Sequence, residues 1–403
     1  MAYLKDYFKS VKNGYKVKNH IVYYVLGSVF AILLVLVMTD SLDRITSSLL
    51  GRIGYTMIAA ISLSLVVGFL GELSLGHAAF MALGAFIGGY MQQYTFASLT
   101  SASPLLSIII AMLIGGTVAA IFGFIVGLPA LRLKGDYLAI VTLAFCEIVK
   151  VIFQNSKKFG NGNVLETYKY DRGHLLLICL IVLFIALAVI MNLIKSKHGR
   201  AIMAIRDNEI AARAMGVNVT YYKLMVFVLS SFFAGIAGVL FANASGGVKC
   251  DNFSYDYSID ILVMVVLGGM GSIKGSMIAA ALITYLDTKL PIWLNLEGNW
   301  VALPQMLYAL ILILIVIYTN APKLKGIREK YNIHNGMVKV KGWIFRLFAR
   351  GKYQHKPDAE HDYRADWSKV PTKIEMDAIL STDFTPDNTY VPDKPDKPKG
   401  GKN

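Results

Sequence analysis

The sequence predicts an all-α, polytopic integral membrane protein with roughly eight to ten transmembrane helices, some broken or re-entrant. Of its 403 residues, 55% are hydrophobic and only 16% are charged, whereas a soluble chain carries roughly 25% charged residues. Long apolar runs recur along the chain. They are apolar throughout rather than alternating with polar residues, and this excludes an outer-membrane β-barrel.

The charge pattern predicts the orientation. A net charge of +14 on a soluble chain would suggest nucleic-acid binding, but on a membrane chain it marks cytoplasmic loops and anionic headgroups. The basic loops 128–135 and 195–221 fall on the same side of the alternating count as both termini. By the positive-inside rule that side is the cytoplasm. Loop 154–173 is also basic and counts as outside, so it is the exception.

The chain begins with a basic lead over residues 1–20, where apolar residues at helical spacing alternate with lysines. This pattern predicts a cytoplasmic amphipathic helix on the inner leaflet, with a disordered lead as the alternative. The transmembrane domain follows over 21–320. Its expected spans are Ile21–Met38, Ile53–Leu70, Gly76–Met91, Leu105–Leu128, Tyr137–Phe153, Leu175–Ile194, Tyr222–Ala242, Ile259–Leu286 and Val301–Tyr318. The run at 259–286 contains a Gly-rich break and fits either two short crossings or a re-entrant hairpin.

Two tail segments follow the last span. Over residues 321–381, an apolar face among basic residues predicts a cytoplasmic amphipathic tail on the inner leaflet. Residues 382–403 are rich in Pro, Asp and Lys, a composition that predicts disorder.

Two segments with several glycines, hereafter the two glycine breaks, interrupt the apolar runs. The first, residues 68–86, contains Glu72, Ser74 and His77, and Ser74 is expected to cap the following helix. The second, residues 265–282, contains four glycines and Lys274. Interrupted helices in two halves of a chain point to a transporter's substrate site, where half-helix N-termini can hold a carboxylate. The alternative is a pair of polar turns at the membrane surface.

Four ionisable or polar residues are therefore candidates for lining a substrate pathway: Glu72, Ser74, His77 and Glu147. A charge at the centre of a membrane helix costs ~2.5–3.5 kcal/mol, so such residues usually face a cavity or a partner. Glu147 lies inside an apolar run, where pairing with Lys150 or snorkelling is the alternative. A lone histidine such as His77 is more often a hydrogen-bonded packing residue.

The stretch Lys195–Val217 is polar and basic between two apolar runs. Asp207 is expected as the N-cap of a helix and Gly216 as its C′ residue. The intervening helix has about two turns, which is too short to be stable alone. Glu209 and Arg213 are spaced to pair on one face, while Ile210, Ala211, Ala214 and Met215 share another. A partner protein is therefore expected to cover this helix.

The sequence offers no catalytic chemistry. Its three cysteines (Cys146, Cys179, Cys250) suit neither a disulfide framework nor a metal site, and no His/Cys/Glu group has metal-ligand spacing. The phosphate-binding pattern G-x-x-x-x-G-K-[ST] is absent, because the lysine of GGMGSIKGS follows Ile273. We therefore expect no enzyme, no metal and no cofactor, and any ATP that drives the protein should be bound by another chain.

Four segments, in order over about residues 55–320, carry a family resemblance: GELSLGHAAFMALGAF, LRLKGDYLAIVTLAFCEIVK, GRAIMAIRDNEIAARAMGVNVTYYKLMVFVLSSFFAGIAGVLFA and SIDILVMVVLGGMGSIKGSMIAAAL. Together they resemble the LivM-type permease subunits of the branched-chain amino acid ABC importers. The resemblance makes 21–320 a permease domain and does not cover the tail after about Lys323.

The resemblance also implies a mechanism. Residues 195–220 would form a coupling loop whose short cytoplasmic helix docks on an ATP-hydrolysing subunit, although Ile210 departs from the EAA---G form of other ABC permeases. The coupling residues expected are Arg206, Asp207, Glu209, Ala211, Ala212 and Gly216. The partners implied are a LivH-like permease, two ATPase subunits like LivG and LivF, an extracellular substrate-binding protein and membrane lipid, in a bacterial plasma membrane with both termini cytoplasmic.

The substrate and class have alternatives. Leucine, isoleucine and valine are the leading substrates, and related permeases carry urea or short-chain amides. EIAARAMGVNVTYYKL also resembles the second half of a helix-turn-helix, which would suggest a membrane-tethered DNA-binding regulator. The loop is pinned between two spans and has no helical domain beside it, so we expect no nucleic-acid partner. A passive channel is a weaker alternative.

Overall fold

The computed structural model describes residues 44–131, 136–159, 164–170, 172–293 and Met306, and nearly all of them are helical. All belong to one compact unit, Met1–Leu324. The predicted lead 1–20, the spans Ile21–Met38 and Val301–Tyr318, and the tails 321–381 and 382–403 lie outside the described residues. The helices are α3 (Arg44–Ser64), α4 (His77–Leu83), α5 (Ala97–Ala102), α6 (Pro104–Ala130), α7 (Asp136–Asn155), α8 (Arg172–Lys195), α9 (Lys197–Asp207), α10 (Glu209–Ala214), α11 (Val219–Ser245), α12 (Tyr255–Leu267) and α13 (Ile273–Trp293).

Shorter elements connect these helices. Three π-helical segments continue α3 and α4: η2 (Leu65–Leu70), η3 (Gly84–Gly88) and η4 (Met91–Thr95). Two 3₁₀ turns and two short strands complete the described part of the chain: η5 (Lys157–Phe159), η6 (Cys250–Phe253), β1 (Leu165–Glu166) and β2 (Gly247–Val248).

Five described helices are long and apolar enough to cross a bilayer. They are Thr46–Leu70, Pro104–Ala130, Tyr137–Asn155, Gly173–Lys195 and Val219–Ser245. Each coincides with a predicted span, so the all-α membrane fold class is confirmed. The predicted span Gly76–Met91 is built instead from the shorter pieces α4, η3 and η4.

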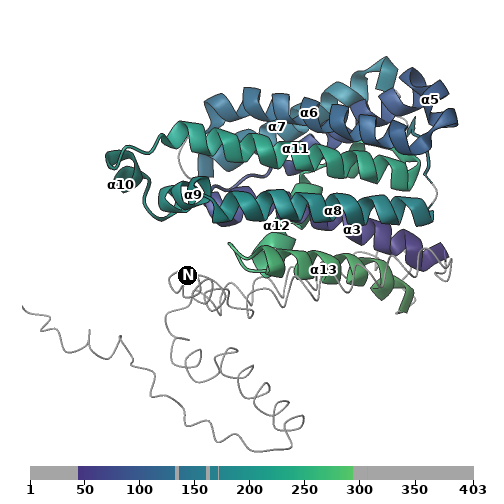
Figure 1. The fold of residues 1–403 in the computed structure, drawn as a ribbon. Helices are drawn as coiled ribbons and strands as arrows, with labels where there is room; N and C mark the ends of the chain where they lie inside the picture. Colours follow the sequence, from purple (N-terminus) through teal and green to yellow (C-terminus); the bar gives the residue numbers. More distant parts are fainter. Residues whose placement is uncertain (1–43, 132–135, 160–163, 171, 294–305, 307–403) are drawn as a thin grey trace, which may run out of the picture. The chain divides into compact units, whose positions relative to one another are not determined.

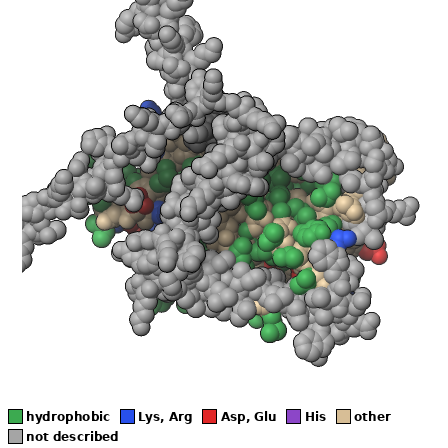
Figure 2. Space-filling view, turned by 90° about the horizontal axis from the view of Figure 1, so that it is seen from below, with side chains coloured by type: hydrophobic (Ala, Val, Ile, Leu, Met, Phe, Trp, Pro, Cys, Tyr) green, Lys and Arg blue, Asp and Glu red, His purple; other side chains and the backbone are tan. Residues whose placement is uncertain are grey.

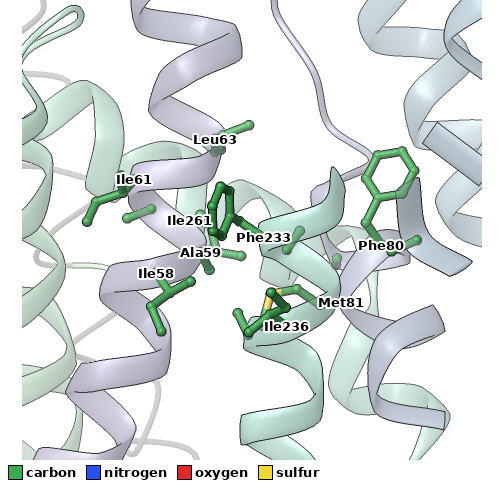
Figure 3. Packing of buried hydrophobic residues seen from close by; sticks show 14 of the residues in the cluster. Ile58, Ala59, Ile61, Leu63, Phe80, Met81, Phe233, Ile236 and Ile261 are labelled. Atoms are coloured by element: carbon green, nitrogen blue, oxygen red, sulfur yellow. The ribbon is translucent and has the colours of Figure 1, made fainter. Parts of the chain in front are cut away.

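The centre of the bundle is formed by α3 with η2 and by α11. The membrane-length window of the first is 89% buried and that of α11 is 67% buried, against 39% for α6 and α7 and 28% for α8. In Figure 3, buried side chains of α3 face α11, α4 and α12 across this core. The labelled residues are Ile58, Ala59, Ile61, Leu63, Phe80, Met81, Phe233, Ile236 and Ile261.

Glycines let α11 touch α4 and η3 through the backbone. A Cβ at Gly84 would lie 2.0 Å from the carbonyl oxygen of Gly235, and one at Gly238 would lie 1.9 Å from that of Met81. Such close approach is how membrane helices associate when hydrophobic burial gives little driving force. Gly84 and Gly88, which are spaced as a G-x-x-x-G pair, therefore serve helix packing.

Large apolar side chains remain exposed on the outer helices. Ile121 of α6, Ile140 of α7 and Ile185 of α8 are all more than half exposed. In Figure 2, hydrophobic side chains of described residues gather on the face that the view presents. A soluble protein rarely leaves such patches uncovered, so these faces suit a membrane.

The predicted break in 259–286 is a tight turn between α12 and α13. Gly269 and Gly271 have φ angles of +93° and +83°, a left-handed conformation that glycine adopts without a Cβ penalty. With 13 residues, α12 is about 20 Å long, shorter than a hydrocarbon core of ~30 Å. The run is thus a helical hairpin with one short arm.

The loops gather at two ends of the bundle. Figure 1 shows α9 and α10 beyond the ends of α8 and α11, at the opposite end from α5. At the other end of α11 from α10, β1 pairs antiparallel with β2. This pairing joins the 154–173 loop to the segment that follows α11. The alternating count assigns the 154–173 and 195–221 loops to opposite sides, and the structure separates them in the same way.

Candidate functional site

The predicted coupling loop, residues 195–220, contains two helices, whereas the sequence predicted one. The first, α9, begins at Ser196, whose Oγ accepts hydrogen bonds from the backbone N–H groups of His198 (3.1 Å) and Gly199 (3.3 Å). Ile202 and Ile205 of α9 are buried. A serine cap followed by apolar residues at i, i+3 spacing is the signal that predicts such a helix.

The second helix, α10, is the predicted short helix, but its N-cap lies one residue later than the sequence predicted. Asn208 is the cap, and its Oδ1 accepts a hydrogen bond from the N–H of Ala211 at 3.0 Å. Asp207 is instead the last residue of α9. Because α9 packs against the bundle and continues through Asp207, the chain first leaves helical geometry at Asn208.

The C-terminus of α10 is as predicted. Gly216 has φ +83°, its N–H bonds the carbonyl of Arg213, and the N–H of Val217 bonds that of Ala212. These two bonds are the Schellman pattern, which stops a helix sharply. α10 therefore has both ends fixed, although it is only six residues long.

The predicted apolar face of α10 points to solvent. Ile210 is 80% exposed and Met215 is 85% exposed, and Ala211 and Ala214 are exposed beside them, whereas Ala212 is buried. At the head of the helix lies a recess of about 410 Å³ lined by Asp207, Asn208, Glu209, Ile210 and Arg213. Exposed apolar side chains beside a polar recess form a surface that a protein partner can cover.

Four charged side chains, hereafter the Lys223 cluster, connect α10 to the first glycine break. Glu209 accepts hydrogen bonds from Arg213 at 2.7 Å, the predicted i, i+4 pair, and from Lys223 at 3.0 Å. Lys223 also donates to Glu72, at 2.5 Å. Lys223 is only 4% exposed. The two carboxylates, rather than water, therefore stabilise its positive charge. Two cations and two anions leave the cluster neutral.

A second cation joins the coupling loop to the glycine breaks. Arg206 Nη1 donates to the carbonyl oxygen of Gly68 at 2.8 Å, near the C-terminus of η2, where a cation complements the helix dipole. A Cβ at Gly271 would lie 3.0 Å from the same guanidinium nitrogen. Arg206 therefore touches both breaks at once.

The two breaks also touch each other. A Cβ at Gly68 would lie 2.7 Å from the backbone nitrogen of Gly271. The structure thus brings together two interruptions that lie about 200 residues apart in the sequence, and it places them beside the coupling loop.

The predicted capping role of Ser74 is wrong. Ser74 is buried, but the N-cap of α4 is Gly76. Hydroxyls of neighbouring helices bond the free amides here: Leu75 N–H donates to Thr142 Oγ1 at 3.0 Å, and Ala78 N–H donates to Ser258 Oγ at 2.9 Å. Because these donors are engaged, they are not available to a substrate carboxylate in this conformation.

The other two pathway candidates lie apart from the coupling loop. His77 is buried and is hydrogen-bonded through Nε2 to Ser62 Oγ at 2.8 Å. Glu147 lies on α7, and its buried Oε1 has no hydrogen-bond partner among the described residues. Lys150, one turn further along, pairs with Asp251 at 3.5 Å. The structure therefore brings Glu72 to the coupling loop but not Glu147.

The cysteines are free and buried. Over the part of the chain that the structure describes, no group of His, Cys, Asp and Glu side chains is arranged to hold a metal ion. The contacts of the site are thus ion pairs, caps and close backbone approaches.

Comparisons with known proteins agree with this architecture. Residues 45–318 match the family described as branched-chain amino acid transport system / permease component. The chain is 35% identical over 260 residues to the high-affinity branched-chain amino acid transport system permease protein LivM of Salmonella typhimurium, covering 56% of this chain and 59% of that protein. Its identity to LivM of Escherichia coli is 31% over 316 residues, covering 70% and 71%.

A probable branched-chain amino acid transport permease protein LivM of Methanocaldococcus jannaschii is 27% identical over 326 residues, covering 69% of this chain and 92% of that protein. No solved structure matches the chain.

Proposed function

The chain belongs to the branched-chain amino acid transport permease family, and we propose that it is the membrane-spanning permease subunit of an ATP-driven importer. In this proposal it forms part of the translocation pathway together with a LivH-like permease. Two ATPase subunits bind and hydrolyse ATP, and an extracellular protein delivers the substrate. The chain itself is a transport subunit and not an enzyme.

The observation that carries the proposal is the exposed apolar face of α10. Isolated helices shorter than about 12 residues are marginal in water, yet this one is fixed at both ends and presents Ile210 and Met215 to solvent. A dedicated docking surface explains why a rigid small helix displays large apolar side chains.

The sidedness of the loops supports this assignment. The basic coupling loop and both glycine breaks lie at one end of the bundle, away from the β1–β2 pair. The positive-inside rule makes the coupling-loop end cytoplasmic, which is where an ATPase operates. Both termini belong to the same side in the alternating count of spans, in a bacterial plasma membrane.

Leucine, isoleucine and valine are the proposed substrates, because the relatives are named as branched-chain amino acid permeases. Among the pathway candidates we favour Glu147, whose buried carboxylate oxygen has no partner within the described residues. Glu72 is paired with Lys223, and His77 is paired with Ser62. Urea or short-chain amides remain the alternative substrates to include in transport assays.

The DNA-binding alternative fits the structure poorly. The second helix of the helix-turn-helix resemblance is the start of α11, a 27-residue membrane-length helix at the centre of the bundle. A recognition helix must instead enter the major groove.

The proposal is tested by co-purification and uptake. Ile210→Lys and Met215→Lys should remove the ATPase from the purified complex and abolish ATP-dependent leucine uptake in proteoliposomes. The matched control is Tyr94→Lys, an exposed site on η4, which should retain both. Uptake by this chain without ATP would support a passive channel, and retention of the ATPase by both lysine variants would refute the docking surface.

A further inference from the structure

We propose that Lys223 and Arg206 are positioning residues that transmit movement of α10 to the two glycine breaks. This inference rests on the proposed function, because it assumes that an ATPase moves α10. It assigns a role to Lys223, which the sequence did not single out, and a new role to Glu72.

Lys223 bonds both α10 and the segment of the first glycine break. Its ammonium group on α11 donates to Glu209, the first residue of α10, and to Glu72, in the segment between η2 and α4. Because the lysine is buried, both ion pairs lie in a poorly hydrated place, and separating either pair loses an attraction that water does not fully replace. A displacement of α10 therefore pulls on Lys223, and Lys223 pulls on the first break.

Arg206 provides a parallel connection from α9. It holds the Gly68 carbonyl, and its stem fills the space beside Gly71, where a Cβ would lie 3.0 Å from Arg206 Cγ. Its guanidinium lies equally close to the position of a Cβ at Gly271. Movement of α9 and α10 therefore shifts Arg206, and Arg206 pushes on the backbone of both glycine breaks.

A purely stabilising role explains this arrangement less well. α10 is already fixed by its Asn208 cap, its Schellman turn and the Glu209–Arg213 pair. Buried ion pairs seldom stabilise more than apolar side chains of similar size would, because desolvation offsets the attraction. Lys223 instead connects segments 151 residues apart, which suits a device that fixes relative position.

The test uses the complete transporter in proteoliposomes and measures leucine transported per ATP hydrolysed. Lys223→Met should lower this ratio about tenfold, within the 5- to 150-fold range of typical coupling between sites. Lys223→Arg should keep most of it. The matched control is Arg52→Met, which removes the exposed pair between Arg52 of α3 and Asp287 of α13 (3.0 Å). Arg52 lies about 24 Å from Gly68 along the helix axis.

Docking is measured in the same variants through Met215→Cys, whose thiol is cross-linked to the ATPase. If the cross-link persists and the ratio stays within twofold of wild type in Lys223→Met, the inference fails while the proposed function stands. If the cross-link is missing even with Lys223 intact, the proposed function fails.

Glu72→Gln provides the second variant in case Lys223→Met does not reach the membrane. It leaves Lys223 paired with Glu209 and removes only the charge at the break. It should also lower the ratio, by a smaller factor, with docking intact. A normal ratio in Glu72→Gln overturns the inference independently of the lysine variant.

Discussion

The two ends of α11 are held by different kinds of contact. At its start, Lys223 is held by two carboxylates. Its end is held by backbone hydrogen bonds. The N–H of Tyr170 donates to the carbonyl of Asn243 at 3.1 Å, and the N–H of Thr167 donates to the carbonyl of Gly246 at 3.3 Å. Backbone bonds fix one geometry, whereas ion pairs between long side chains persist through small shifts. Under the proposed function, we therefore expect the end of α11 beside α10 to move against a fixed far end.

Glycines that end helices allow a matched test of this difference. Gly246 ends α11 with φ +70°, and a Cβ there would lie 2.9 Å from Lys169 Cβ. Gly246→Val should therefore combine left-handed strain of ~1–2 kcal/mol with overpacking of ~1–3 kcal/mol. We expect a large fall in membrane abundance and in thermal stability, measured by gel filtration of heated detergent extracts. Wild-type stability would show that the far end is not rigid.

Gly216→Val makes the same change at the coupling end. Gly216 has φ +83°, but no atom lies within 4 Å of a Cβ placed there. Only the strain of ~1–2 kcal/mol applies, and it is confined to α10. Membrane abundance should stay normal while ATP hydrolysis becomes uncoupled from uptake. Normal uptake in this variant would contradict the docking role of α10.

The caps of α10 give a smaller effect. Asn208→Ala should cost about 1 kcal/mol of local helix stability, or about fivefold faster hydrogen exchange at the Ala211 amide. Asp207→Ala should leave that amide protected, because Asp207 is not the cap. Mass-spectrometric exchange on the membrane-embedded transporter distinguishes the two variants, and equal exchange in both would mean that the cap has been misassigned.

Thiol chemistry gives the smallest effect. Burial raises the pKa of the Cys250 thiol, which follows β2 at the far end. Less thiolate is present than at an exposed cysteine at the same pH, and the thiolate is the reactive form. The unsubstituted chain should therefore take up little maleimide at pH 7, whereas Met215→Cys should label fully. Rapid labelling of Cys250 would show that the far end opens readily.

Local features of the site were predictable from the sequence. The end of α10 follows from one glycine, and the Glu209–Arg213 pair follows from i, i+4 spacing. The N-cap was missed because Asp207 and Asn208 are equally good caps. The choice between them depends on how far α9 extends, and that depends on Ile202 and Ile205 packing into the bundle.

Contacts between distant segments were not predictable. Glu72 and Lys223 stand out only as opposite charges near apolar runs, and no sequence spacing connects them. The glycine breaks were recognised, but their mutual contact through Gly68 and Gly271 depends on how α12 turns back beside η2. The fold class followed directly from the apolar runs, because the bilayer restricts a chain of this composition to helices.

The central claim is that α10 lies on the cytoplasmic side and binds a separate ATPase subunit. The most direct measurement is cross-linking through Met215→Cys in native membranes, since the three natural cysteines are buried. We expect a cross-linked product containing the ATPase subunit, and labelling of that cysteine from the cytoplasmic side only. Labelling from the extracellular side, or no product with an ATPase at any linker length, would contradict the account.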